Sequence, residues 1–123
     1  MIRIMNFVKS GPLIAVAIVV VCLDVAWAHA ILVASIPEAN AILNGPSIDI
    51  TLKFNVRVDT KRSSIRLLDS DRGARSLVVL PGKASNIILA RANDVRPGKY
   101  KLSWLALASD GHITRGEIPF SVR

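Results

Sequence analysis

The chain has 123 residues, of which 51% are hydrophobic. This length is sufficient for one domain with a modest core and short for two. Sixteen Lys and Arg residues against nine Asp and Glu residues give a net charge of +7. No basic run is interleaved with aromatic side chains, which argues against a nucleic-acid-binding surface. The charge predicts a solvated positive surface suited to anionic membranes or acidic partners.

Residues 1–28 have the pattern of a cleaved secretory signal peptide. An almost unbroken apolar run, Leu13–Leu23, follows Arg3 and Lys9 and is closed by the small-x-small stretch Ala26–Ala28. This order of basic leader, apolar run and small residues is typical of a signal peptide cut after the last small residue. The run is shorter than the roughly 20 residues that cross a bilayer as a helix. We therefore expect cleavage after Ala28.

Two other interpretations of the N-terminus remain open. The segment could be retained as an uncleaved anchor. Alternatively, a lipid could be attached at Cys22, although that processing needs a small residue before the cysteine and Val21 stands there. Neither alternative is favoured by the residues around the predicted cut.

Cleavage changes the inventory of metal-binding side chains. Cys22, Met1 and Met5 would be removed, so residues 29–123 contain neither cysteine nor methionine. An exported chain of this composition forms no disulfide and has no sulfur ligand for a soft metal ion. It keeps fourteen basic and eight acidic residues, a net charge of about +6.

Alternation of apolar and polar residues, separated by turn residues, dominates the rest of the chain. Ile48–Phe54 is the clearest example, with Ile48, Ile50, Leu52 and Phe54 on one face. The predicted strands, in chain order, are Ile31–Ser35, Ile48–Phe54, Ser64–Asp69, Ser76–Leu80, Asn86–Arg91, Lys99–Ser109 and Glu117–Val122. The predicted turns are Pro37–Asn40, Ser70–Gly73, Pro81–Gly82 and Pro97–Gly98.

About seven short strands in one small domain predict an all-β fold, an antiparallel Ig-like or Greek-key β-sandwich formed by residues 29–123. A barrel is the alternative that the pattern leaves open. Tyr100 and Trp104 lie on the same face of the longest strand as other apolar residues, and we expect both in the core.

Only two histidines occur, His29 and His112. His112 lies in a polar turn, and Gly111 lets the backbone fold tightly so that Asp110 and His112 can face one point. Cleavage after Ala28 would give His29 a free α-amine beside its imidazole, and the two groups can close a chelate ring. Two imidazoles, one amine and one carboxylate form a nitrogen-rich set that favours Cu(II) over Zn(II), Mg(II) or Ca(II).

The usual catalytic patterns are missing from the sequence. The predicted mature chain has no cysteine nucleophile, and neither Gly-x-Ser-x-Gly nor a glycine-rich phosphate loop occurs. Two histidines with scattered acidic residues form no convincing triad.

These residues resemble the copper resistance protein C (CopC) family over essentially the whole predicted mature chain. The resemblance rests on "AHA" at the predicted cut, "SIPEANAIL" after it, "ITLKFN" in the next strand and "GKYKLSWLALASDGHITRGEIPFSV" at the end. The last stretch, a Tyr-x-x-x-Trp strand that leads into Ser-Asp-Gly-His, is the most specific.

The resemblance implies one Cu(II) site per chain, formed by the first histidine through amine and ring and by the Asp and His of the turn, here His29, Asp110 and His112. It also implies a periplasmic, monomeric copper carrier or buffer rather than an enzyme, working beside a CopD-type membrane copper transporter.

Two features depart from the family pattern. Some members bind Cu(I) at a second, methionine-rich site, and the predicted mature chain has no methionine, so a Cu(II)-only form is expected. Many members also carry an acidic residue where Val56 stands, which argues against an additional carboxylate ligand at that position.

Two other functions compete with a copper carrier. A copper-dependent redox enzyme of the N-terminal-histidine type would need an accessible axial position and a platform of aromatic residues, and only Phe54, Tyr100, Trp104 and Phe120 survive the cut. A structural β-sandwich module with an incidental turn histidine is the third possibility, and it would gain if the mature chain began anywhere but at His29.

Overall fold

A computed structural model describes residues 29–71 and 73–123. The signal peptide predicted for residues 1–28 lies outside the described residues. Within them the only helical element is the short 3-10 turn η1, Thr60–Arg62. No helix in these residues has the length and apolar character needed to cross a membrane.

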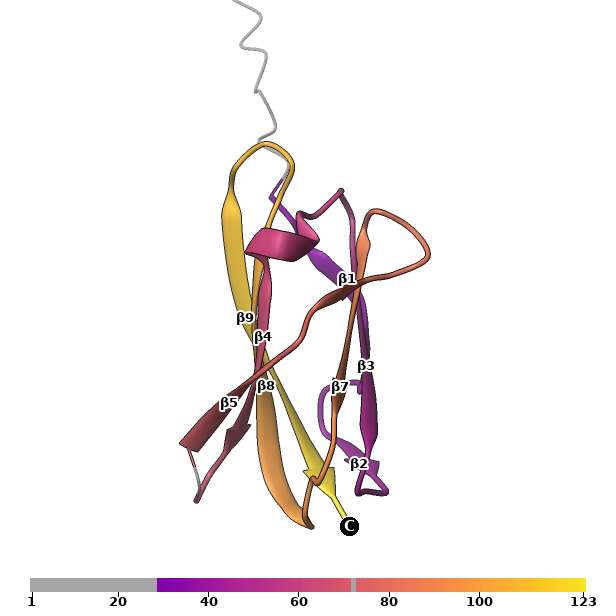
Figure 1. Cartoon of the computed structure of the whole chain (residues 1–123), viewed down its shortest axis with the longest axis vertical. Helices are drawn as coiled ribbons and strands as arrows, with labels where there is room; N and C mark the ends of the chain where they lie inside the picture. The colour runs from indigo at the N-terminus through magenta and orange to yellow at the C-terminus, as the bar shows by residue number, and fades with distance from the viewer. Residues whose placement is uncertain (1–28, 72) are drawn as a thin grey trace, which may run out of the picture.

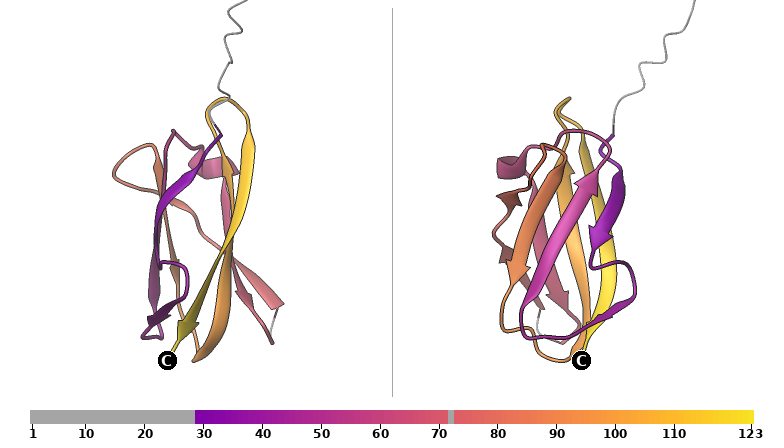
Figure 2. Two further views of the ribbon diagram at one scale, coloured as in Figure 1. Left: turned by 180° about the vertical axis from the view of Figure 1, so that it is seen from behind. Right: turned by 90° about the vertical axis from the view of Figure 1, so that its right-hand side faces the viewer.

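The strands form two sheets that face each other (Figures 1 and 2). The four-stranded sheet has the order β1-β3-β7-β6 and the five-stranded sheet the order β2-β9-β8-β4-β5. The first sheet contains β1 (Leu32–Ile36), β3 (Ile48–Phe54), β6 (Leu80–Pro81) and β7 (Ile87–Ala92). The second contains β2 (Ala41–Leu43), β4 (Ser64–Asp69), β5 (Gly73–Leu77), β8 (Gly98–Leu107) and β9 (Ile113–Val122). The predicted all-β sandwich is confirmed, and the strands do not close into the alternative barrel.

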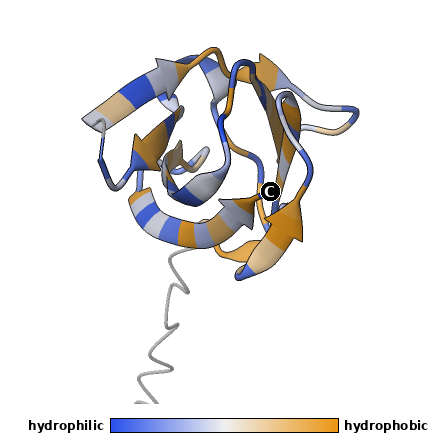
Figure 3. Ribbon diagram, turned by 90° about the horizontal axis from the view of Figure 1, so that it is seen from below, coloured by the Kyte–Doolittle hydropathy of each residue, from blue (hydrophilic) through white to orange (hydrophobic). Residues whose placement is uncertain are grey.

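Alternation along the strands fills the space between the sheets. The four inward residues of β3 are at most 3% exposed, and Tyr100, Leu102, Trp104 and Ala106 of β8 are at most 8% exposed. The predicted core positions of Tyr100 and Trp104 are thus confirmed. Figure 3 shows hydrophobic and hydrophilic residues alternating along the strands, seen from the end of the sandwich opposite the β8–β9 turn.

The strand pattern differs from the prediction in two short elements. The segment predicted as Ser76–Leu80 is divided between β5 and β6, because the β4–β5 hairpin already begins at the pair Asp69↔Gly73. Pro81, predicted as a turn residue, belongs to β6 and pairs with Ile88. This position is compatible with proline because β6 is an edge strand, where a missing N–H leaves no ladder bond unmade.

The edge strand β2 was also not predicted as a strand. It pairs with the end of β9 in parallel, which departs from the otherwise antiparallel pattern. The chain leaves β1 in one sheet, turns at Pro37–Asn40 and enters the other sheet at β2. This crossover ties the two sheets together along the side where β1 and β2 are the edge strands. Asn40 N–H donates to the carbonyl of Pro119 in β9 at 2.6 Å.

The hairpin of β8 and β9 is the longest pairing in the described residues, from Gly98↔Val122 to Leu107↔Ile113. The prediction began the last strand at Glu117 and missed its first four residues, which include Gly116. Gly116 lies opposite Trp104, whose indole lies over it. The indole also meets the ring of Phe54 edge-to-face, with centroids 5.2 Å apart. A glycine inside this strand is therefore explained by close packing rather than by a turn.

The substitution Gly116→Ala should destabilise the fold. The added Cβ would lie 2.6 Å from Cε2 and 2.8 Å from Nε1 of Trp104. Overpacking of this kind costs about 1–3 kcal/mol, which urea unfolding at equilibrium would measure. In the double variant with Trp104→Leu, the penalty of Gly116→Ala should largely disappear. Additive penalties would contradict the contact.

Candidate metal centre

The turn between β8 and β9 carries Asp110 and His112 at one end of the sandwich. Ala108 N–H donates to the carbonyl of His112 at 2.8 Å, and Gly111 N–H donates to the carbonyl of Ala108 at 2.9 Å. Gly111 has a φ of 90°, a left-handed conformation that glycine adopts without a steric penalty. Ser109 N–H also donates to the carbonyl of Arg57, which joins the turn to the segment after β3. The turn is thus closed by its own hydrogen bonds and is attached to the segment that follows β3 in the other sheet.

Asp110 contacts His112 through both carboxylate oxygens. Oδ1 accepts the backbone N–H of His112 at 3.0 Å, and Oδ2 lies 3.1 Å from Nδ1 of its imidazole. The backbone N–H of His112 lowers the pKa of the Asp110 carboxyl below its ordinary value; burial opposes the shift, and the imidazole adds to it. The carboxyl group is therefore anionic at neutral pH and held beside the ring, as a metal ligand would need.

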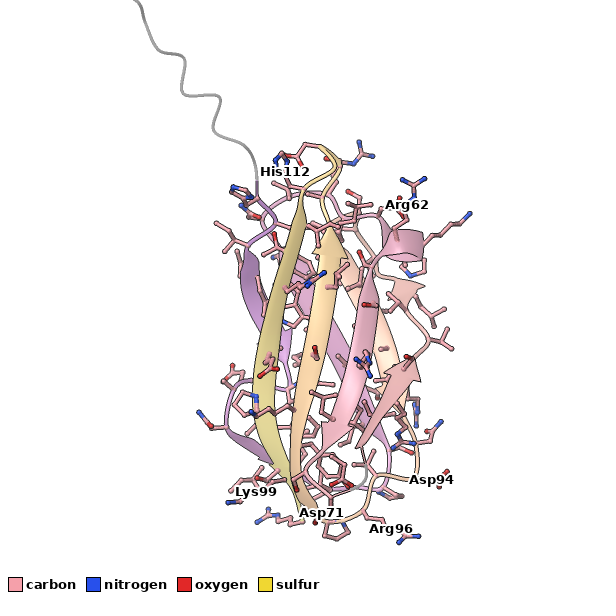
Figure 4. The ribbon with its side chains drawn as sticks, turned by 90° about the vertical axis from the view of Figure 1, so that its left-hand side faces the viewer. Arg62, Asp71, Asp94, Arg96, Lys99 and His112 are labelled. Carbon is pink, nitrogen blue, oxygen red and sulfur yellow. The ribbon has the colours of Figure 1, made fainter. Side chains whose placement is uncertain are left out.

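His29 lies beside this turn although 83 positions separate it from His112 in the sequence. The two imidazole rings meet edge-on, with centroids 5.2 Å apart and an interplanar angle of 85°. Figure 4 labels His112 at one end of the sandwich, and Asp71 and Lys99 at the other. His29 is exposed and His112 is half-buried. The structure thus brings His29 next to the turn that carries Asp110 and His112.

Two buried or paired neighbours hold the segment that carries His29. Ala30 is fully buried, at 0% exposure. Ile31 N–H donates to the side-chain oxygen of Asn55 at 2.7 Å, and Asn55 N–H donates to the carbonyl of Ile31 at 3.0 Å. Asn55 was not predicted as a functional residue, because no pattern in "KFNVRV" distinguishes it from an ordinary residue after a strand. Neighbouring Val56 packs against the core.

The pairwise distances suit neighbouring ligands of one ion. Two donor atoms that are each about 2.0–2.1 Å from a metal ion, and that subtend a right angle at it, lie about 2.9 Å apart. This is close to the 3.1 Å between Oδ2 of Asp110 and Nδ1 of His112. The rings of His29 and His112 are also adjacent, with centroids 5.2 Å apart, as the imidazoles of two ligands of one ion must be.

His112 belongs to both close pairs, one with Asp110 and one with His29. In the described residues, no group of three or more His, Cys, Asp or Glu side chains is already close enough to hold a metal ion. In the full chain the backbone nitrogen of His29 belongs to the peptide bond with Ala28, where the cut is predicted, and is therefore an amide. The fourth predicted donor, an α-amine, therefore exists only after cleavage.

A model of the CopC domain matches residues 32–123. The chain belongs to the CopC family. Protein YobA of Escherichia coli K12 is 32% identical over 102 residues, which cover 79% of this chain and 81% of YobA. The family recognised from the sequence is thus confirmed.

Two solved structures of similar proteins share the fold. CopC from Methylosinus trichosporium OB3b has a TM-score of 0.71 and 27% identity, over 76% of this chain and 93% of that chain. PcoC, described as a methionine-rich copper resistance protein from Escherichia coli, has a TM-score of 0.65 and 25% identity, over 78% and 100% of the two chains. In contrast, both methionines of this CopC-family chain, Met1 and Met5, precede the predicted cut. The CopC domain match begins at Leu32, so the role of His29 stays a prediction.

In copper-free protein the Asp110 carboxyl should titrate below the range of an ordinary aspartate, as measured by carboxyl-carbon NMR. Because the folded-state pKa is lowered, the carboxylate stabilises the turn at neutral pH, and this contribution is lost as the pH falls through the folded-state pKa. His112→Ala should raise the pKa only part of the way, since the backbone N–H remains and the imidazole is lost. An ordinary or raised pKa in the unsubstituted protein would show that the contact is not made in solution.

Proposed function

We propose that this CopC-family chain is exported, is cut after Ala28 and binds one Cu(II) ion in the periplasm as a carrier or buffer in copper resistance or homeostasis. The ligands are the amine and imidazole of His29, the carboxylate of Asp110 and the imidazole of His112. The observation that carries the proposal is the meeting of His29 with His112 while His112 also faces Asp110.

The chemistry of these donors supports oxidised copper as the cargo. The α-amine has a reference pKa near 8, so a strongly polarising metal ion can displace its proton around neutral pH. Amine, two imidazoles and one carboxylate form a tetragonal set in which Cu(II) is the most strongly bound of the common divalent ions. Because the predicted mature chain has no sulfur ligand, Cu(I) gains little there, and we propose a site for Cu(II) alone.

The exposed position of the site suits exchange of the ion with a partner. His29 is exposed, and Asp110 and His112 each retain about a third of their side-chain exposure, 31% and 33%. A carrier must release its cargo, which an ion at the surface can do by exchanging one ligand at a time. We propose that a monomer passes copper to or from a CopD-type membrane transporter.

A copper-dependent redox enzyme is the second candidate, and the positions of the aromatic residues disfavour it. Such an enzyme needs an exposed aromatic platform for a polymeric substrate. Beyond position 28 the aromatic residues are Phe54, Tyr100, Trp104 and Phe120, and each is at most 8% exposed. The proposed function is therefore binding rather than catalysis.

Blocking the N-terminal amine should weaken Cu(II) binding. The test compares chains that begin at His29 with chains that carry Gly-Ser-Gly-Ser before it, because a histidine at the second or third position would form a new chelate of its own. Competition titration should show a loss of at least about 10–100-fold, the range found when even outer-sphere partners of a metal are removed. Equal affinities would refute the amine as a ligand. In a second measurement, the electron paramagnetic resonance spectrum of the Cu(II) complex should show fewer nitrogen ligands in the extended chain.

Asp110→Asn should also weaken Cu(II) binding, because it removes the anionic ligand but keeps the oxygen that accepts the His112 N–H. The matched control is Asp69→Asn, since Asp69 accepts the N–H of Asp71 at 3.0 Å in the same turn geometry, as Asp110 does with His112. Competition titration of the chain that begins at His29 should show a loss of about tenfold or more for Asp110→Asn and none for the control. Equal effects of the two variants would point to general charge rather than to a ligand.

A further inference from the structure

We propose that Asn55 is a positioning residue that holds the N-terminal segment so that His29 lies against the Asp-Gly-His turn before copper binds. Asn55 makes both backbone hydrogen bonds of Ile31, through its side-chain oxygen at 2.7 Å and its own N–H at 3.0 Å. Only Ala30 stands between Ile31 and His29. As a statement about copper capture, the inference rests on the proposed function.

The register of β1 explains why this attachment is needed. β1 pairs with β3 at Ala34↔Lys53 and again at Leu32↔Phe54, with an irregularity between the two pairs. The bulge redirects the chain and weakens the ladder in its N-terminal half. Beyond Leu32 the two hydrogen bonds to Asn55 continue the attachment toward His29. Without them, the pairing of β1 with β3 would end three residues from the histidine.

Asn55 can act as a fixed point because it directly follows a buried residue whose backbone is hydrogen-bonded on both sides. It follows Phe54, which is 0% exposed and packs against Trp104. Phe54 is held by Asn86 from both sides, since its N–H donates to the carbonyl of Asn86 at 2.8 Å and its carbonyl accepts from the Asn86 side chain at 2.9 Å. A series of hydrogen bonds therefore connects Asn86, the residue before β7, with the end of β3 and with the segment before β1.

Because Ala30 is buried, the attachment of Ile31 to Asn55 also restricts the position of His29. With Ile31 hydrogen-bonded and the Ala30 methyl group buried, the backbone of the first residues has little freedom left. A metal ligand on such a segment loses less conformational entropy on binding than one on a free chain end. Asn55 thus contributes to copper affinity without touching copper, because its side-chain oxygen already accepts the Ile31 N–H.

The first test uses copper-free protein that begins at His29. Asn55→Ala should increase the hydrogen-exchange rate of the Ile31 amide, while Asn55→Asp should keep protection because a carboxylate oxygen can accept the same bond. The matched control is Asn44→Ala, since Asn44 accepts only from the Arg123 side chain near the C-terminus. Unchanged exchange at Ile31 in Asn55→Ala would overturn the inference, whatever the protein does with copper.

The second test measures Cu(II) affinity in chains that begin at His29 and in chains extended by Gly-Ser-Gly-Ser. Asn55→Ala should weaken binding by about 10–100-fold in the first and have little effect in the second, where the amine is already blocked. Asn55→Asp should restore affinity, and Asn44→Ala should leave it unchanged. Equal losses in both backgrounds would assign Asn55 to general stability and overturn its role through His29.

The two tests separate this inference from the proposed function. If the chain that begins at His29 binds Cu(II) no more tightly than the extended chain, the proposed ligand set is wrong. Faster exchange at Ile31 in Asn55→Ala would even then support Asn55 as the residue that holds the N-terminal segment.

Discussion

The packing of Trp104 on Gly116 and Phe54 is the contact on which both halves of the candidate site depend. Trp104 lies on β8 and Gly116 opposite it on β9, the strand that begins directly after His112. Phe54 ends β3 in the other sheet and is followed by Asn55, the residue that binds Ile31. One aromatic contact across the core therefore fixes the distance between the turn and the N-terminal segment. Such edge-to-face aromatic pairs stabilise a fold by more than the burial of their apolar surface alone would.

In this arrangement, the residues that set the geometry of the candidate site are buried, and the candidate ligands lie at the surface. The residues that set the geometry, Phe54, Trp104 and Ala30, are at most 6% exposed, while the residues proposed to bind the ion lie at the surface. A copper site formed only by residues of a free loop would be as mobile as that loop. Here the turn is closed by its own hydrogen bonds, and the facing segment is hydrogen-bonded to Asn55, which follows the buried Phe54. Under the proposed function, the ion would exchange while its ligands stay in place.

The sequence predicted the sandwich because alternation in Ile48–Phe54 and Lys99–Ser109 reflects one buried face directly. The members of the proposed site could be named from the sequence because histidine is rare in this chain and the Asp-Gly-His turn constrains its neighbours, and their role as ligands stays a prediction. The sequence could not predict the start of β9, because Gly116 has no local signal that distinguishes close packing under an indole from a turn. Asn55 was missed for a similar reason. Its role depends on a hydrogen bond to Ile31, 24 residues away, and on a bulge in β1 that alternation does not encode.

Under the proposed function, export and copper binding are coupled by covalent chemistry. Before the cut, the backbone nitrogen of His29 belongs to a peptide bond, and a neutral amide is a poor ligand compared with an amine. After the cut, the same atom becomes an amine with a reference pKa near 8, and it closes a chelate ring with the imidazole beside it. The side chains of Asp110 and His112 are the same in both forms. The complete ligand set would therefore form only in the mature chain, so that full affinity for Cu(II) arises after the chain has left the cytoplasm.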